Sequence, residues 1–128
     1  MTTERLVFRG HAGDNLSARL DRPDTTPRTT ALFAHCFTCS KDIPAARRIA
    51  EALSGLGIAV LRFDFSGLGH SEGEFENTNF TSNVTDLEYA ARHLESMGLA
   101  PSIIIGHSLG GAAVLKAAGN IHSVKAVV

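Results

Sequence analysis

The sequence has no excess of charge of either sign and no long hydrophobic run. Its 128 residues include 12 Lys and Arg against 13 Asp and Glu, a formal net charge of −1. A near-neutral chain lacks the electrostatic footprint of a protein that binds nucleic acid or an anionic membrane, so neither partner is expected. No apolar run approaches the roughly 20 residues that a membrane-spanning helix requires.

The first residues do not resemble an export signal, and cysteines are few. The first ten residues are "MTTERLVFRG", without the apolar segment of a signal peptide, so we expect a cytoplasmic protein. The only two cysteines are Cys36 and Cys39, within "HCFTCS". Cytosolic thiols usually stay reduced, yet a C-x-x-C between an apolar run and a helical pattern also matches a thioredoxin-like redox site. The sequence leaves both interpretations open at this point.

The composition that remains is that of a globular domain. Hydrophobic residues make up 44% of the chain and charged residues 20%, and the length suffices for one compact domain with a core. In residues 16–21 apolar Leu16, Ala18 and Leu20 alternate with polar side chains, which predicts a half-buried strand. Residues 5–10 are its expected partner in an antiparallel hairpin, and residues 21–30 form a Pro- and Thr-rich loop.

Beyond that loop, apolar runs alternate with helical periods. Short runs such as these are typical of strands buried on both faces of a parallel sheet. Strands are expected at 31–35, 57–63, 102–107 and 123–128, and helices at 43–56, 80–97 and 110–119. The order predicts an α/β fold in which a mostly parallel sheet opens with an antiparallel hairpin and carries helices on both faces. The chain ends inside the last strand, so we expect a domain truncated after the strand that follows the third helix.

Two of the expected helices carry apolar stripes that should face the sheet. The first stripe consists of Ala46, Ile49, Ala50, Leu53 and Leu56. The second consists of Phe80, Val84, Leu87, Ala91 and Leu94.

The strongest chemical motif is G-x-S-x-G at residues 106–110, between the strand "SIIIG" and the helix "GGAAVLKAA". A strand that turns sharply into a helix holds its serine in a strained conformation, and side chains at Gly106 and Gly110 would collide. The turn raises the Ser108 hydroxyl above the sheet and aims a helix N-terminus at it, which favours developing negative charge. We interpret the motif as a nucleophile elbow.

Other ligand motifs fail on their spacing. A phosphate-binding P-loop requires Lys after its last glycine, and here Gly111 is followed by Ala112. The glycines of 67–73, "GLGHSEG", do not open into a helix with the dinucleotide spacing. No second cysteine or histidine pair completes a zinc site, so neither a metal nor a cofactor is expected.

Three segments together resemble the serine hydrolases of the α/β-hydrolase fold. "ALFAHCFTCS" at 31–40 is similar to a strand followed by an H-G-F-type oxyanion loop, "VLRFDFSGLGHSEG" at 60–73 to the D-x-x-G-x-G-x-S turn, and "IIIGHSLGG" at 103–111 to the elbow. The chain looks like the N-terminal two-thirds of such an enzyme. "HCFTCSKD" also resembles the hydrolase half of bacterial fusions with OsmC-like domains, which makes a fused OsmC-like domain in a longer protein an expectation.

The resemblance implies a role for several residues. Ser108 would attack a small acyl or ester substrate and form an acyl-enzyme, without a metal or organic cofactor. The backbone N–H groups of Leu109 and Phe37 would stabilise the oxyanion. Positions 36 and 39 are commonly glycine in the family, so Cys36 and Cys39 depart from its pattern, and we favour reduced thiols over a redox pair.

The catalytic acid and base are missing from the expected places. The family order is Ser, then Asp or Glu, then His, but no Asp or Glu follows Ser108, and His122 precedes the last strand. Among other candidates, His70 has no evident partner and is expected to pack a turn, as Asp64 is expected to cap one. His35 should fix the loop that follows it. His11 and His93 are expected at the surface.

These observations favour one function and leave two others open. The preferred interpretation of residues 1–128 is a single, incomplete α/β-hydrolase domain, a serine esterase-like hydrolase without its C-terminal strands, cap and Asp/His portion. The first alternative is a non-catalytic module that pairs through its exposed last strand, for instance as a homodimer. The second is a thiol redox module at Cys36 and Cys39.

Overall fold

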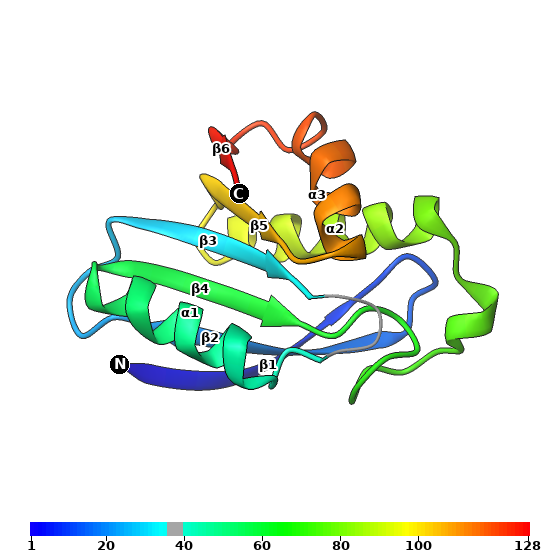
Figure 1. Ribbon diagram of the computed structural model, residues 1–128, viewed down its shortest axis with the longest axis horizontal. Helices are drawn as coiled ribbons and strands as arrows, with labels where there is room; N and C mark the ends of the chain where they lie inside the picture. Colours follow the sequence, from blue (N-terminus) through cyan, green and yellow to red (C-terminus); the bar gives the residue numbers. More distant parts are fainter. Residues whose placement is uncertain (36–39) are drawn as a thin grey trace.

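The computed structural model describes residues 1–35 and 40–128, with the backbone alone at Leu109. These residues form one six-stranded sheet and three α-helices (Figure 1). In chain order the elements are β1 (Thr2–Arg9), β2 (Asn15–Arg22), β3 (Thr29–Ala34), α1 (Pro44–Gly55), β4 (Ile58–Phe63), a 3₁₀ helix (Phe75–Asn77), α2 (Phe80–Ser96), β5 (Ile103–Gly106), α3 (Leu109–Ala118) and β6 (Ala126–Val127). The order matches the one predicted from the sequence.

The strands are arranged β1-β2-β4-β3-β5-β6 across the sheet. β1 and β2 form the antiparallel hairpin, β2 pairs antiparallel with β4, and all remaining pairs are parallel. The predicted α/β fold is therefore confirmed. Because β3, β4 and β5 run in parallel, their carboxyl ends meet at one edge of the sheet, where ligand sites of open α/β sheets form.

Helices cover both faces of this sheet. On one face, Ala46 and Ala50 of α1 pack against Phe33 and Val60, and α1 crosses in front of β4 in Figure 1. On the other face, α2 and α3 pack their buried side chains against β2, β3, β4 and β5 in the larger of the two core clusters. Burial on both sides explains why the central strands are nearly continuous apolar runs.

The predicted stripes are only partly correct. In α1 the buried row is Ala46, Ala50 and Ser54, spaced four residues apart, because only a narrow line of the helix touches the sheet. Ile49 and Leu56 lie beside that line and are exposed. In α2 the buried run begins at Asn83, so Phe80 in the first turn is also exposed, whereas the other four stripe residues are buried.

Candidate active site

Ser108 occupies the turn between β5 and α3, at the carboxyl edge of the sheet. Its backbone has φ 59° and ψ −122°, and it is the one non-glycine residue with positive φ among residues 1–35 and 40–128. Such a conformation is rarely adopted by L-residues and costs about 1–3 kcal/mol. The turn is closed by Gly110 N–H, which donates to His107 O at 3.0 Å, and by Gly111 N–H, which donates to Ser108 O at 2.9 Å. An exposed serine is therefore held in a strained backbone at the sheet edge.

Two glycines allow this turn to sit close to its neighbours. A Cβ at Gly110 would lie 2.5 Å from the carbonyl oxygen of His35 and 2.6 Å from that of Ala34. A Cβ at Gly106 would lie 2.5 Å from the Cα of Gly111. Real Cβ atoms do not approach backbone atoms so closely, so both positions require glycine, as the sequence predicts.

Of the two predicted oxyanion donors, the structure describes the backbone of one, Leu109. Leu109 is the first residue of α3, where backbone N–H groups have no partner within the helix and carry the positive end of its dipole. Phe37 lies outside the described residues, as do Cys36 and Cys39. The oxyanion roles of Leu109 and Phe37 and the roles of Cys36 and Cys39 therefore stay predictions.

The remaining histidines lie in different environments. His107 is exposed beside Ser108, and His122 precedes β6 and therefore lies at the opposite edge of the sheet from Ser108. His93, expected at the surface, stacks on Phe8 with ring centroids 5.8 Å apart. His70 does follow β4 at the carboxyl edge, and 75% of its side chain is exposed.

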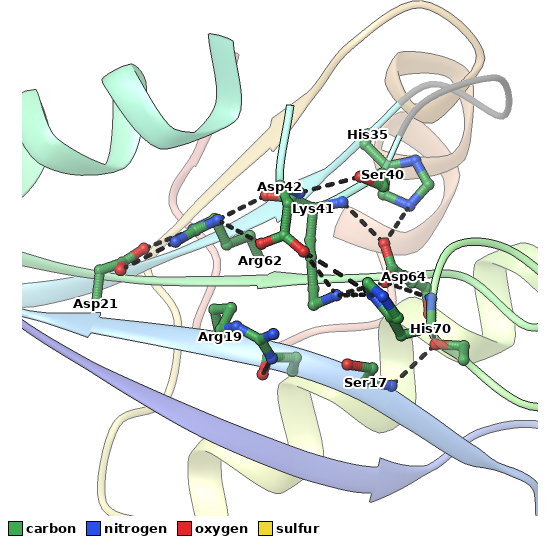
Figure 2. Close-up of polar contacts among 12 residues, drawn as sticks. Ser17, Arg19, Asp21, His35, Ser40, Lys41, Asp42, Arg62, Asp64 and His70 are labelled. Atoms are coloured by element: carbon green, nitrogen blue, oxygen red, sulfur yellow. Dashed lines mark hydrogen bonds and ion pairs between the residues drawn. The ribbon is translucent and has the colours of Figure 1, made fainter. Parts of the chain in front are cut away.

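A buried charge cluster occupies the same edge, around Asp64 (Figure 2). The carboxylate of Asp64 is fully buried and accepts Lys41 N–H at Oδ1 (2.8 Å), Lys41 Nζ at Oδ2 (2.7 Å) and His70 N–H at Oδ2 (3.0 Å). His35 Nε2 lies 3.5 Å from Oδ1. Asp64 thus caps its turn as expected, but it also binds a fully buried lysine that the sequence analysis did not identify.

The cluster continues toward β2 through Arg62. Arg62 Nε donates to the buried carboxylate of Asp21 at 2.7 Å, and its NH1 group donates to the Lys41 carbonyl at 2.7 Å and to Asp42 at 3.3 Å. Desolvation pushes the pKa of Asp42 upward, but the hydrogen bond and charge of Lys41, with Arg19 and Arg62, outweigh it and hold that pKa below its ordinary value. Asp42 therefore remains ionised to lower pH than an isolated aspartate.

A second buried carboxylate, Asp86 of α2, fastens the turn between β1 and β2. It accepts the backbone N–H of His11 at 2.9 Å and the N–H and hydroxyl of Ser66 at 3.0 and 2.8 Å. The His11 ring nitrogen Nδ1 lies 2.9 Å from Asp86, so His11, which was expected at the surface, is half-buried and bound to this carboxylate. The available signal was a carboxylate at the buried face of an amphipathic helix, four residues before buried Ala90.

This second cluster borders a hollow but does not include Ser108. The hollow has a volume of about 370 Å³ and is lined in part by His11, Ser66 and Asp14. Both ring contacts of His11, to Asp86 and to Ser66, involve the same nitrogen, Nδ1. A catalytic histidine instead uses one nitrogen for the serine and the other for the carboxylate, so these three residues are not a catalytic triad.

Within residues 1–35 and 40–128, no group of three His, Cys, Asp or Glu side chains is arranged to hold a metal ion. In the same part of the chain, no helix has the length and apolarity to cross a bilayer.

The sequence also matches a known family. The model of the S33 serine aminopeptidases covers residues 26–128, most of the chain. The chain belongs to this family of α/β hydrolases. Its strained serine and the two close-packed glycines lie within the matched region.

Two solved structures illustrate the relationship. The esterase domain of a Rhodothermus marinus protein is 50% identical with a TM-score of 0.80, and the match covers 99% of this chain and 49% of that domain. Est1E of Butyrivibrio proteoclasticus, solved with ferulic acid, is 26% identical with a TM-score of 0.87 over 95% of this chain and 50% of its own. The chain therefore shares its architecture with about half of each of these two proteins.

A curated relative matches a shorter stretch. The human mitochondrial palmitoyl-protein thioesterase ABHD10 is 36% identical over 73 residues, which is 57% of this chain and 23% of that protein. The chain spans about half the length of the two solved relatives, less than the two-thirds that the sequence resemblance implied.

Proposed function

We propose that this S33-family chain carries the nucleophile portion of a serine hydrolase that acts on carboxylic esters or related acyl compounds. The observation that carries the proposal is the strained, exposed backbone of Ser108 between β5 and α3. Backbone strain at an exposed polar residue has no stabilising value of its own, and it is typical of sites where a side chain is presented for reaction. The nucleophile elbow of this fold is such a site.

In the proposed reaction, Ser108 Oγ attacks the acyl carbonyl carbon and its proton passes to a general base. The oxyanion of the tetrahedral intermediate accepts hydrogen bonds from the N–H groups of Leu109 and Phe37. The alcohol or thiol then departs with a proton, and water hydrolyses the resulting acyl-enzyme. Esters and thioesters both follow this course, and both substrate classes occur in the names of the relatives.

The general base and its carboxylate are the parts that this sequence does not supply. No Asp or Glu follows Ser108, and His122 lies at the opposite edge of the sheet. His35 and Asp64 are buried, and the Asp64 carboxylate already forms an ion pair with Lys41. We therefore propose that residues 1–128 form an incomplete hydrolase domain, with nucleophile and oxyanion donors but without the acid–base pair.

External imidazole provides the test, because it can replace a missing histidine base in solution. We expect a fluorophosphonate probe to label Ser108 weakly or not at all in buffer. The labelling rate should rise at least about tenfold when imidazole is added, since an unassisted hydroxyl is a poor nucleophile. Mass spectrometry of the digested protein locates the adduct.

Ser108→Ala is the matched control, because it retains the fold and removes only the hydroxyl. No adduct should form in this variant with or without imidazole. Labelling of other serines at the same rate in both proteins would contradict the assignment of Ser108 as the nucleophile.

A further inference from the structure

One buried carboxylate lies between two segments at the edge that presents Ser108. Asp64 Oδ1 accepts the backbone N–H of Lys41 and lies 3.5 Å from His35 Nε2, so it contacts the chain just after β3 and again just before α1. Figure 2 shows Lys41 and His35 on the same carboxylate. The Asp64 carboxylate packs directly against Gly69, because a Cβ added at Gly69 would lie 2.4 Å from the carboxyl group.

Lys41 is the cation that holds this carboxylate in place. Its side chain is fully buried, and Nζ lies 2.7 Å from Asp64 Oδ2, 3.1 Å from Asp42 Oδ2 and 3.3 Å from His70 Nδ1. A buried ammonium is tolerated only where carboxylates and hydrogen-bond partners replace its hydration. The groups around Lys41 therefore fix its position as well as that of Asp64.

His35 connects the cluster to the turn of Ser108 through the backbone. Its ring is fully buried and meets Phe65 edge-on at 5.3 Å. Its carbonyl oxygen is one of the two atoms that exclude a side chain at Gly110. The adjacent carbonyl of Ala34 accepts the backbone N–H of His107 at 3.0 Å. A shift of the backbone at Ala34 and His35 would therefore displace His107 and Gly110, which lie on either side of Ser108.

We propose that Lys41 is a positioning residue for Ser108. Through Asp64 it holds His35, and the backbone of Ala34 and His35 in turn holds the strained turn of Ser108. The proposal rests on the proposed function for its catalytic meaning, but the positioning itself is a structural effect that can be measured without activity.

Hydrogen exchange of the His107 amide measures this effect, because that N–H bonds to Ala34. We expect Asp64→Asn and the double variant Lys41→Met/Asp64→Asn to exchange this amide at least about tenfold faster than the unmodified chain, while the slowest amides report the global stability. The double variant removes both charges and leaves no unpaired buried ion, so it should fold even if Lys41→Met alone does not. Exchange is followed residue by residue by NMR.

Asp86→Asn is the matched control. Asp86 is also a fully buried carboxylate, but its partners are His11 and Ser66 rather than Lys41 or His35. Its His107 amide should exchange within about twofold of the unmodified chain at equal global stability. An equal acceleration in Asp86→Asn would overturn the proposal. An unchanged His107 amide in the folded double variant would also overturn it, because Lys41 would then only neutralise Asp64.

Failure of the proposed function gives a different result. If Ser108 is not the nucleophile, imidazole-assisted labelling is indifferent to Ser108→Ala, while the exchange of His107 still responds to the Asp64 variants. If only the positioning is wrong, labelling at Ser108 proceeds and the exchange does not change.

Discussion

The glycines around Ser108 differ in the room that each has for a side chain. A Cβ at Gly110 would meet two carbonyl oxygens at 2.5 and 2.6 Å, both on backbone that is itself packed. At Gly111 the nearest atom would be 3.8 Å away, an ordinary van der Waals distance, and the residue lies within α3. Both positions are glycine in the sequence, but only Gly110 has no room for a side chain.

A pair of alanine substitutions separates these cases. We expect Gly110→Ala to lower the free energy of unfolding by about 2–4 kcal/mol, because the added methyl group displaces the backbone of β3 or of the turn. Gly111→Ala should raise the free energy of unfolding by up to about 1 kcal/mol, since alanine favours the helix. Urea denaturation measures both, and equal effects would contradict the close approach at Gly110.

At the scale of elements, the segment that leads into α1 is held by charge. Asp42 precedes α1 by two residues and contacts Lys41 and Arg62, while 37% of its side chain is exposed. The folded protein lowers the pKa of Asp42, so the folded state favours its ionised form. The stabilisation is therefore complete above the unfolded pKa of about 3.9 and is lost as the pH falls through the lower folded pKa.

A comparison with Asp42→Asn should reveal this pH dependence, because the asparagine does not titrate. At pH 7 we expect the variant to be less stable by about 1 kcal/mol or less, because solvent screens a partly exposed ion pair. The difference between the two proteins should stay constant from pH 7 to about 5 and vanish progressively below about pH 4. Denaturant titrations at a series of pH values give the curve, and a difference that grows toward acid would have the wrong sign for a lowered pKa.

At the scale of the whole molecule, the sheet presents Ser108 at its carboxyl edge, and we propose that residues 1–128 supply no acid–base pair for it. The residues that follow Ser108 build α3 and β6, and neither brings a carboxylate. β6 is one of the two outer strands of the sheet, and both of its residues are exposed. A homodimer across this strand and a fusion to an OsmC-like domain stay predictions.

The isolated chain should consequently be a very poor enzyme. We expect its turnover of p-nitrophenyl esters to lie at least about 10⁴-fold below the roughly 10 s⁻¹ typical of enzymes, because the proposed nucleophile has no general base in the proposed incomplete site. Steady-state assays of the purified chain beside Ser108→Ala measure the difference. Robust turnover that disappears in Ser108→Ala would show that residues 1–128 hold a complete site.

The sequence predicted those parts of the architecture that depend on short-range patterns of residues. The alternation of Leu16, Ala18 and Leu20 placed β2, and the apolar runs placed the central parallel strands, because burial on one or two faces leaves a periodic trace in the sequence. Gly106 and Gly110 were identified because a sharp strand-to-helix turn has no room for their side chains.

Contacts between distant segments leave no such trace. Buried Lys41 looks like any surface lysine in the sequence, and its burial depends on Asp64, which lies 23 residues away along the chain. His11 contacts Asp86, which lies 75 residues away along the chain. Ile49 and Leu56 are exposed although their burial was predicted, because the packing of the sheet decides which side of the helix is covered.

The sequence alone thus determined the family fold and the serine that we propose as nucleophile, since both follow from short-range patterns. Only the tertiary structure decided which charges are buried together around Asp64, because the desolvation of an ion depends on every segment that packs against it.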